Sequence, residues 1–185
     1  SNQPYTNSLI LNNKVLVPIM NNSWDDEALE VYEEALPGYK ILGFTGTWES
    51  TDALHCRAKG IPDLELLQIF HNPLNDSDSP QSDGYMVQAI IDDISGAGLI
   101  DDELKIFWWT DEMDESEEIL MEVCPQDIED CYRASIPSQF SDTVVKYYIQ
   151  AIDLTGRFET FPMAGYFAFD AIGGTPAQNG DVNMD

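Results

Sequence analysis

The stretch Thr51–Asp63 reads TDALHCRAKGIPD and separates two segments of different character. The segment before it contains short β-rich runs and one helical pattern, whereas the segment after it has the pattern of β-strands throughout. Cys56 follows His55 directly within this linker. A cysteine at such a junction is either a nucleophile or an ordinary small apolar residue, so the rest of the chain has to distinguish the two interpretations.

The composition is that of a globular and strongly acidic protein. The chain has 185 residues, of which 43% are hydrophobic and 11% aromatic, enough for a packed core. Its 34 acidic and 8 basic residues give a formal net charge of −26. This charge disfavours nucleic acid and anionic membranes as partners, because both would be repelled. No apolar run reaches the roughly 18 residues of a membrane span. The ordinary interpretation of so many acidic residues is a soluble surface, and cation binding is the more specific and rarer alternative.

The chain contains three cysteines, Cys56, Cys124 and Cys131. The last two flank Pro125–Asp130, which has the pattern of a hairpin loop. Residues on either side of such a loop can face each other within disulfide reach. We therefore predict a Cys124–Cys131 disulfide, and with it a secreted, periplasmic or cell-surface protein. The alternative is a pair of reduced, half-buried thiols.

The segment before the linker predicts a β-β-α-β unit. Its elements follow in the order Ser8–Leu11, Lys14–Ile19, a helix from Ser23 to Pro37, and Tyr39–Phe44. Asn12-Asn13 predicts a tight hairpin because asparagine tolerates positive φ, and Ser23 predicts a capping box at the start of the helix. The third strand is nearly all apolar, which indicates burial on both faces. One such unit cannot bury both faces of its own sheet and needs neighbours.

Three strings in this segment are similar to the end of the catalytic domain of a known enzyme family. They are YTNSLILNNKVLVP, DDEALEVYEEALPGYKILG and ALHCRAKGIPD. They resemble the agmatine deiminase and bacterial peptidylarginine deiminase family of guanidine-modifying enzymes, whose fold is a propeller of ββαβ modules. The resemblance covers roughly residues 4–63. It implies that Cys56 is the nucleophile, that Asn7 lines the active site, and that the substrate is arginine-like.

Deimination needs more groups than this chain supplies. A thiolate has to attack a weakly electrophilic guanidinium carbon, an acid has to protonate the departing ammonia, and a base has to activate water. Members of the family supply a histidine and two aspartates from earlier modules. His55 points away from Cys56 if the segment is extended, and His71 falls in a predicted strand, so both are expected to be structural. The resemblance therefore implies a chain that is inactive in isolation and needs no catalytic cofactor.

From Leu66 onwards the pattern predicts an immunoglobulin-like sandwich. The candidate strands are Leu67–His71, Tyr85–Ile91, Leu104–Trp109, Ile119–Val123, Cys131–Ile136, Val144–Ile152 and Phe158–Ala171. The string VVKYYIQAIDLTGR resembles a strand pair of immunoglobulin-like modules appended to secreted bacterial enzymes, and bacterial peptidylarginine deiminases carry such a module after the catalytic part.

The aromatic run Phe107–Trp109 has two interpretations. It is either a mixture of core and half-exposed side chains, or a platform for sugar or peptide binding. Because neighbouring side chains alternate, at least one of the three faces outward or against residues 1–66. We expect it to pack against residues 1–66, and self-association as a homo-oligomer is the competing way to cover their apolar surface.

The last residues predict a flexible tail. Gly173–Gln178 has the composition of a linker, and Asp181, Asn183 and Asp185 have the spacing that opens a calcium loop. Three such ligands would bind Ca²⁺ only weakly.

The predicted fold class is α+β, with three parts. Residues 1–66 form one ββαβ propeller-type module that is a fragment of a catalytic domain, residues 67–172 an immunoglobulin-like sandwich, and residues 173–185 the tail. The leading hypothesis is the C-terminal part of a secreted deiminase that converts a guanidinium to a ureido group and ammonia. Protein arginine, free arginine and agmatine all remain open as substrates. The alternative is a non-catalytic binding, adhesion or accessory module.

Overall fold

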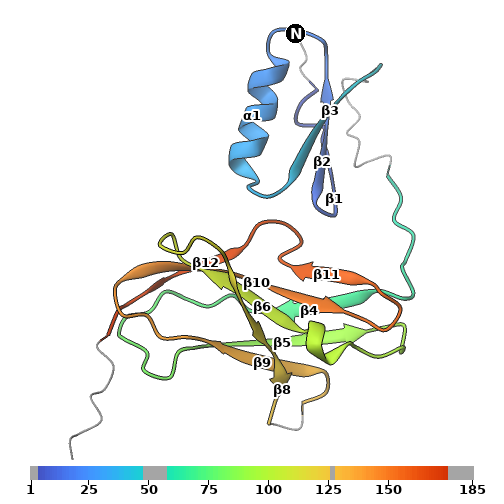
Figure 1. Cartoon of the computed structure of the whole chain (residues 1–185). Helices are drawn as coiled ribbons and strands as arrows, with labels where there is room; N and C mark the ends of the chain where they lie inside the picture. The colour runs from blue at the N-terminus through green and yellow to red at the C-terminus, as the bar shows by residue number, and fades with distance from the viewer. Residues whose placement is uncertain (1–3, 48–57, 126–127, 175–185) are drawn as a thin grey trace, which may run out of the picture. The chain divides into compact units, whose positions relative to one another are not determined.

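A computed structural model describes residues 4–47, 58–125 and 128–174 of the chain (Figure 1). The chain forms two compact units. The first comprises Ser1–Asp63 and Met163–Gly165, and the second comprises Leu64–Pro162 and Tyr166–Asp185. Each unit has its own secondary structure and is described separately.

The first unit holds a three-stranded sheet and one helix. Its elements are β1 (Leu9–Leu11), β2 (Lys14–Ile19), α1 (Asp25–Ala35) and β3 (Lys40–Thr45). Strand β2 is central, pairing antiparallel with β1 and parallel with β3. The β1–β2 turn contains Asn12 at φ 51°, a conformation that asparagine tolerates better than most residues. The two fully buried side chains of this sheet, Val15 and Val17, both come from β2.

The start of helix α1 differs from the predicted capping box at Ser23. The helix begins at Asp25, and its N-cap residue Trp24 makes no side-chain cap hydrogen bond. Instead, the carboxylate of Asp25 accepts hydrogen bonds from the backbone N–H groups of Met20 and Asn22, at 3.1 and 2.9 Å. The acidic first turn still suits the positive end of the helix dipole. A carboxylate at the first helical position thus ties the helix to the strand before it.

Strand β3 is not buried on both faces, contrary to the prediction from its apolar sequence. Only Ile41 and Leu42 are even half-buried, and Phe44 is 37% exposed. The physical reason is its place at the edge of the sheet with helix α1 packed on it. Gly43 allows that packing, since a Cβ atom there would lie 3.1 Å from Ile19 and 3.3 Å from Leu29.

The second unit consists of two sheets built from nine strands. One sheet contains β11 (Phe158–Phe161), β10 (Thr143–Ile152), β6 (Lys105–Trp109) and β7 (Glu117–Leu120) in that order, with β12 (Phe167–Ala171) also paired to β10. The other contains β4 (Leu67–His71), β5 (Tyr85–Asp93), β9 (Cys131–Ile136) and β8 (Glu122–Val123). All pairings in both sheets are antiparallel. A short 3₁₀ helix, η1 (Asp101–Glu103), precedes β6.

Both sheets contribute alternate residues to one hydrophobic core. Strand β5 has the strict alternation of buried and more exposed residues expected of a half-buried strand, and β10 has it over most of its length. The core includes Ile91 from one sheet and Ile106, Tyr147 and Phe169 from the other. The second unit is therefore an all-β sandwich, as Figure 1 shows for its two layers.

Two of the predicted strands are each divided in two. The run Ile119–Val123 changes sheets at the buried Met121, whose backbone N–H is bonded to the carbonyl of Leu104, the residue directly before β6. The run Phe158–Ala171 is interrupted at Pro162, which has no N–H to donate and follows a cis peptide bond. The apolar pattern gave no sign of the break at Met121, whereas Pro162 is a strand-breaking signal in the sequence that the prediction of one continuous strand overlooked.

The predicted α+β fold class, with a propeller-type ββαβ module, is wrong. Strands make up 42% of the described residues and helices 9%. The described residues form three separate sheets in which antiparallel pairing dominates, with one α-helix of 11 residues. The reason is that one short helix, which packs mainly on β3, cannot form a layer of its own, so β-sheet packing decides the architecture.

Candidate functional site

Several predicted site residues lie outside the described residues. They are His55 and Cys56 of the linker, and Asp181, Asn183 and Asp185 of the tail. Among the described residues, the candidates are Asn7 in the first unit and, separately, the pocket and the outer sheet face of the second unit.

Asn7 sits in a turn that is held from two sides. Its backbone N–H donates to the Pro4 carbonyl at 2.8 Å, which closes the turn. The Tyr32 hydroxyl of helix α1 lies 2.8 Å from the Tyr5 carbonyl and 2.9 Å from Ser8 Oγ. One hydroxyl can donate to the carbonyl and accept from the serine, so both contacts are satisfied together. The helix thus holds the Tyr5 backbone and the Ser8 side chain, which lie on either side of Asn7 in the sequence.

The side chain of Asn7 is half-buried, and its carboxamide makes no hydrogen bond within the described part of the chain. A carboxamide offers two donors and one acceptor oxygen. An unused amide on a rigid turn is available to a ligand, which is the property that an active-site asparagine requires.

The same turn is tied to Asp25, which sequence analysis did not single out. The Tyr5 hydroxyl donates to Asp25 Oδ1 at 2.8 Å, and the Asp25 residue is only 6% exposed. Burial alone would raise the pKa of Asp25, but the hydrogen bonds from the Met20 and Asn22 N–H groups and from Tyr5 outweigh it and lower the pKa. Asp25 is therefore ionised at neutral pH and serves as a fixed acceptor for the turn.

The second unit contains a pocket of about 550 Å³ next to the edge strand β4. Its walls combine aromatic and apolar side chains with two amides, and the lining residues are Phe70, His71, Asn72, Leu74, Met86, Gln88, Ala89, Ile90 and Phe161. The volume falls within the range of small-molecule sites. No acidic or basic side chain other than the histidine lines it.

Both ring nitrogens of His71 are used within the fold. Nδ1 lies 2.7 Å from the Gln88 carbonyl, which can only accept, so Nδ1 carries the proton. Nε2 lies 2.8 Å from the Tyr147 hydroxyl, which itself accepts from the Leu74 N–H at 2.9 Å. The Tyr147 hydroxyl therefore donates to Nε2, and the imidazole is neutral. Burial lowers the pKa of His71, opposed by the hydrogen bond to Gln88.

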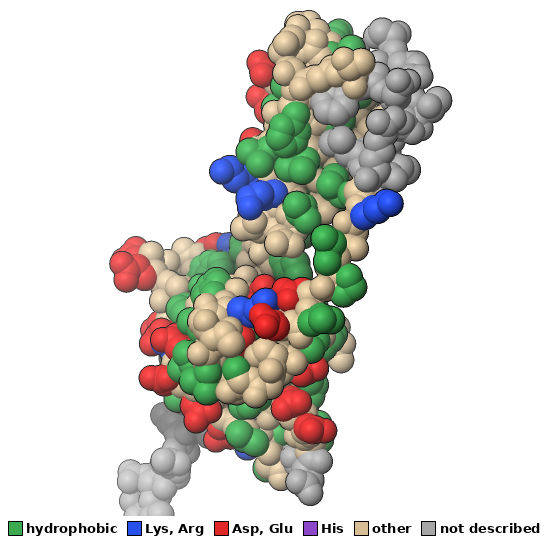
Figure 2. Space-filling model, turned by 90° about the vertical axis from the view of Figure 1, so that its right-hand side faces the viewer, with side chains coloured by type: hydrophobic (Ala, Val, Ile, Leu, Met, Phe, Trp, Pro, Cys, Tyr) green, Lys and Arg blue, Asp and Glu red, His purple; other side chains and the backbone are tan. Residues whose placement is uncertain are grey.

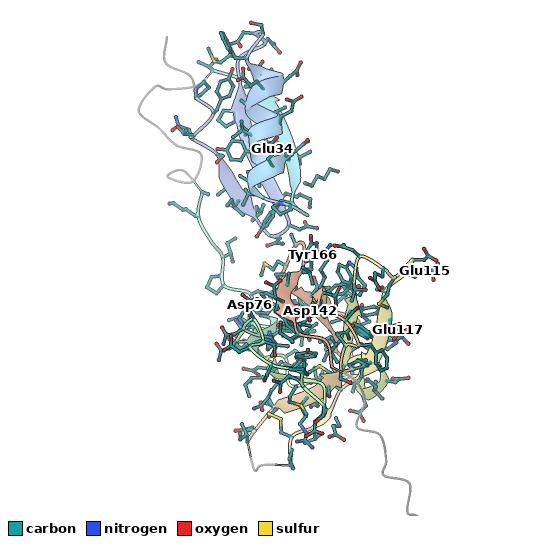
Figure 3. The ribbon with its side chains drawn as sticks, turned by 90° about the vertical axis from the view of Figure 1, so that its left-hand side faces the viewer. Glu34, Asp76, Glu115, Glu117, Asp142 and Tyr166 are labelled. Carbon is teal, nitrogen blue, oxygen red and sulfur yellow. A yellow bond between two sulfur atoms is a disulfide. The ribbon has the colours of Figure 1, made fainter. Side chains whose placement is uncertain are left out.

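An aromatic cluster covers part of the outer face of the β6–β10 sheet. Phe107 stacks on Tyr148 with ring centroids 4.9 Å apart, and Trp109 meets Tyr166 edge-on at 5.3 Å. Trp108 points the other way and is only 6% exposed. Tyr166, labelled in Figure 3, is 45% exposed. The run Phe107–Trp109 therefore contributes one side chain to the core and two to this outer face.

The structure contains a disulfide between Cys124 and Cys131, with Cα atoms 5.3 Å apart. It closes the loop between β8 and β9, two neighbouring strands of the same sheet. Such a bond is compatible with an extracellular protein without establishing that location. Figure 2 shows acidic side chains spread over the visible face of the second unit, as expected of a solvated surface.

No protein-family model matches this chain. None of the described helices is long and apolar enough to cross a membrane. Within the described residues, no group of three or more His, Cys, Asp or Glu side chains is placed to hold a metal ion.

Proposed function

We propose that this chain contributes the nucleophile Cys56 and the substrate-lining Asn7 to a secreted guanidine deiminase. The observation that carries the proposal is the string TDALHCRAKGIPD around Cys56, preceded at family-like spacing by the strings that contain Asn7 and helix α1. The unused Asn7 carboxamide, on a turn fixed by Tyr32, supports the second assignment. The disulfide supports export.

The reaction has two stages. The Cys56 thiolate attacks the guanidinium carbon, and ammonia departs with a proton from a general acid, which leaves a thiouronium intermediate on sulfur. A base then removes a proton from water as the water attacks the same carbon. Collapse of that adduct releases a ureido product and restores the thiolate, so no oxidant or reductant is needed.

The acid and base are proposed to come from outside this chain. His71 is the one histidine that the described residues include, and its Nδ1 and Nε2 atoms are both committed to Gln88 and Tyr147. Releasing His71 for proton transfer would leave the Tyr147 hydroxyl without its acceptor. We therefore expect no turnover by the isolated chain, with the second unit acting as a non-catalytic accessory module.

The test compares two polypeptides in an assay for ureido-group formation from arginine peptides, free arginine and agmatine. The polypeptide encoded by the complete reading frame should turn over at least one of these substrates, and Cys56→Ala should abolish that activity. The 185-residue chain alone should be inactive. Inactivity of the complete polypeptide, or activity that survives Cys56→Ala, would contradict the proposal.

The role of Asn7 has its own matched control. Asn7→Ala should raise the KM of the complete enzyme without lowering its thermal stability, because the carboxamide makes no hydrogen bond in the described fold. Asn13→Ala removes the same group from an exposed turn residue of the same sheet and should leave KM unchanged. Equal KM values for the two variants would remove Asn7 from the site.

A second candidate is a non-catalytic binding or adhesion module, which the outer aromatic cluster of Phe107, Trp109, Tyr148 and Tyr166 favours. Half-exposed aromatic rings on a sheet face suit sugar or peptide ligands. If this candidate holds, Trp109→Ala should abolish retention on a glycan or peptide array, whereas Cys56→Ala should not. Absence of any retained ligand for the unmodified chain would exclude it.

A further inference from the structure

Two loops of the second unit are each organised around one carboxylate. In the loop after β5, Asp93 Oδ1 accepts from the Ser95 N–H at 3.0 Å and from the Ser95 hydroxyl at 2.5 Å. Its Oδ2 accepts from the Gly98 N–H at 2.7 Å. Gly98 has a φ of 100°, which is why a glycine is needed there. This carboxylate fixes the whole bend from residue 93 to residue 98.

The second loop follows β10 and is built around Asp153. Its Oδ1 accepts three hydrogen bonds, from the Thr155 N–H at 2.8 Å, the Thr155 hydroxyl at 2.6 Å and the Arg157 N–H at 2.9 Å. The residue is 0% exposed. Its other oxygen, Oδ2, is fully buried and has no hydrogen-bond partner. Burying an ionised oxygen without a hydrogen-bond partner costs free energy, and a ligand bound to Oδ2 would remove that cost.

The backbone brings the two carboxylates together. Gly98, whose N–H is held by Asp93, accepts through its carbonyl from the Leu154 N–H at 2.8 Å. The next residue, Leu99, forms an isolated antiparallel bridge with Asp153. Asp93 is thus hydrogen-bonded to the Gly98 end of the Gly98–Leu99 segment, and the Asp153 backbone is paired with its Leu99 end. The guanidinium of Arg157 is paired with Glu65 at 3.5 Å.

Both groups carry a negative charge at neutral pH. Aspartate carboxylates are ionised at this pH, and the charge of Asp93 is near enough to act on Asp153. Two anions at close quarters repel each other, and a bound cation would remove that repulsion while satisfying Asp153 Oδ2.

We propose that Asp153 Oδ2 and the Asp93 carboxylate form the anionic half of a calcium-class cation site between these two loops. Ca²⁺ takes six to eight oxygen ligands in flexible geometry, so the remaining ligands would be backbone carbonyls of the two loops and water. With only two carboxylates, the affinity belongs to the weak range of extracellular modules, with a Kd of about 10⁻⁴–10⁻³ M. The smaller Mg²⁺ demands regular octahedral geometry and should bind less well.

The test is a titration of the full chain with CaCl₂ at constant ionic strength, followed by amide ¹H–¹⁵N spectra and by thermal unfolding. We expect saturable shifts of the Ser95, Gly98, Thr155 and Arg157 amides and a rise in the unfolding midpoint, with a smaller response to MgCl₂. Shifts confined to the tail, shifts that do not saturate, or no shift at all would each overturn the site. Because the readout is binding, it is independent of any deiminase activity.

Two substitutions and two controls localise the cation. Asp153→Asn keeps Oδ1 as the acceptor for Thr155 and Arg157 while removing the charge, and it should abolish the calcium-dependent rise in midpoint. Asp93→Asn should reduce it. Asp92→Asn, next to the site, removes a carboxylate that makes no hydrogen bond or ion pair within the described residues, and it should preserve the calcium-dependent rise. The double substitution Asp181→Asn and Asp185→Asn in the tail should also preserve that rise. An undiminished response in Asp153→Asn, or a response lost in either control, would contradict the assignment.

Discussion

The Tyr147 hydroxyl joins two strands of different sheets, and its removal has a calculable effect. It accepts a hydrogen bond from the Leu74 N–H at 2.9 Å and donates one to His71 Nε2 at 2.8 Å. Tyr147 itself is 0% exposed. Tyr147→Phe keeps the ring and its packing against Phe167 and Phe169. It removes both hydrogen bonds and leaves two polar groups unpaired.

The expected loss of unfolding free energy follows from those two bonds. A typical intramolecular hydrogen bond contributes about 1 kcal/mol, and a buried group left without a partner costs about 1–3 kcal/mol. Leu74 and His71 are both half-buried, so water can reach them in part and the lower figure applies. Tyr147→Phe should therefore lower the free energy of unfolding by about 2 kcal/mol.

The assay is urea unfolding monitored by tryptophan fluorescence and far-UV circular dichroism, with Tyr148→Phe as the matched control. Tyr148 is the next residue of the same strand, and its hydroxyl makes no hydrogen bond in the described part of the chain. Its loss should change the unfolding free energy by less than about 0.5 kcal/mol. Equal effects of the two substitutions, or a loss below about 0.5 kcal/mol for Tyr147→Phe, would refute the proposed bridge between the sheets.

Three further outcomes follow from the same structure. The Cys124–Cys131 bond spans 7 residues, so replacing both cysteines with serine should lower the unfolding free energy by about 2.4 kcal/mol, and reductant should then have no additional effect. Thiol titration of the unfolded chain without reductant should find one free thiol, that of Cys56, and three thiols would show that the disulfide does not form. The pKa of His71 is lowered in the folded state, so its stabilising contribution is complete above the unfolded pKa of about 6.5 and is lost as the pH falls below it. Between pH 7.5 and 5.5, the free energy of unfolding should fall more for the wild-type chain than for His71→Asn. The difference should be less than about 1 kcal/mol because the ring is partly exposed. Parallel pH profiles of the two proteins would contradict this.

Local sequence patterns predicted individual strands well. The bounds of β2, β4 and β9 agree with the runs Lys14–Ile19, Leu67–His71 and Cys131–Ile136. In β5 and β10 nearly every second residue is apolar and buried, because a strand that is buried on one face has a period of two. These are properties that a residue's immediate neighbours decide.

The errors come from properties that depend on tertiary placement. The apolar sequence of β3 indicated burial on both faces, but an edge position with one helix leaves much of it exposed. Ser23 had the spacing of a capping residue, but the helix begins at Asp25 with Trp24 at the N-cap and no side-chain cap hydrogen bond. The Asp25 carboxylate instead accepts from the Met20 and Asn22 N–H groups, which precede the helix. The strand run Ile119–Val123 gave no sign that it changes sheets at Met121.

The candidate sites likewise differ in how much of each could be predicted from the sequence. The roles proposed for Cys56 and Asn7 rest on the resemblance of the surrounding strings to a deiminase family. The string VVKYYIQAIDLTGR, which contains Asp153, indicated only a strand pair, since the sequence cannot show that Oδ1 takes three hydrogen bonds while Oδ2 takes none. The proximity of Asp153 to the Asp93 loop likewise depends on tertiary contacts, the bridge between Leu99 and Asp153 and the hydrogen bond from Leu154 to Gly98.

The central claim is that Cys56 is the nucleophile of a guanidine-binding site. Its most direct test is the rate at which Cys56 is alkylated, in the complete polypeptide, by a haloacetamidine compared with the isosteric neutral haloacetamide. A trimethylammonium haloacetamide controls for simple attraction of cations to a chain of net charge −26. We predict that the amidine reagent reacts at least about tenfold faster than either of the others, and that agmatine or an arginine peptide suppresses the excess. Equal rates for the amidine and trimethylammonium reagents, or an excess that arginine compounds leave unchanged, would contradict the claim.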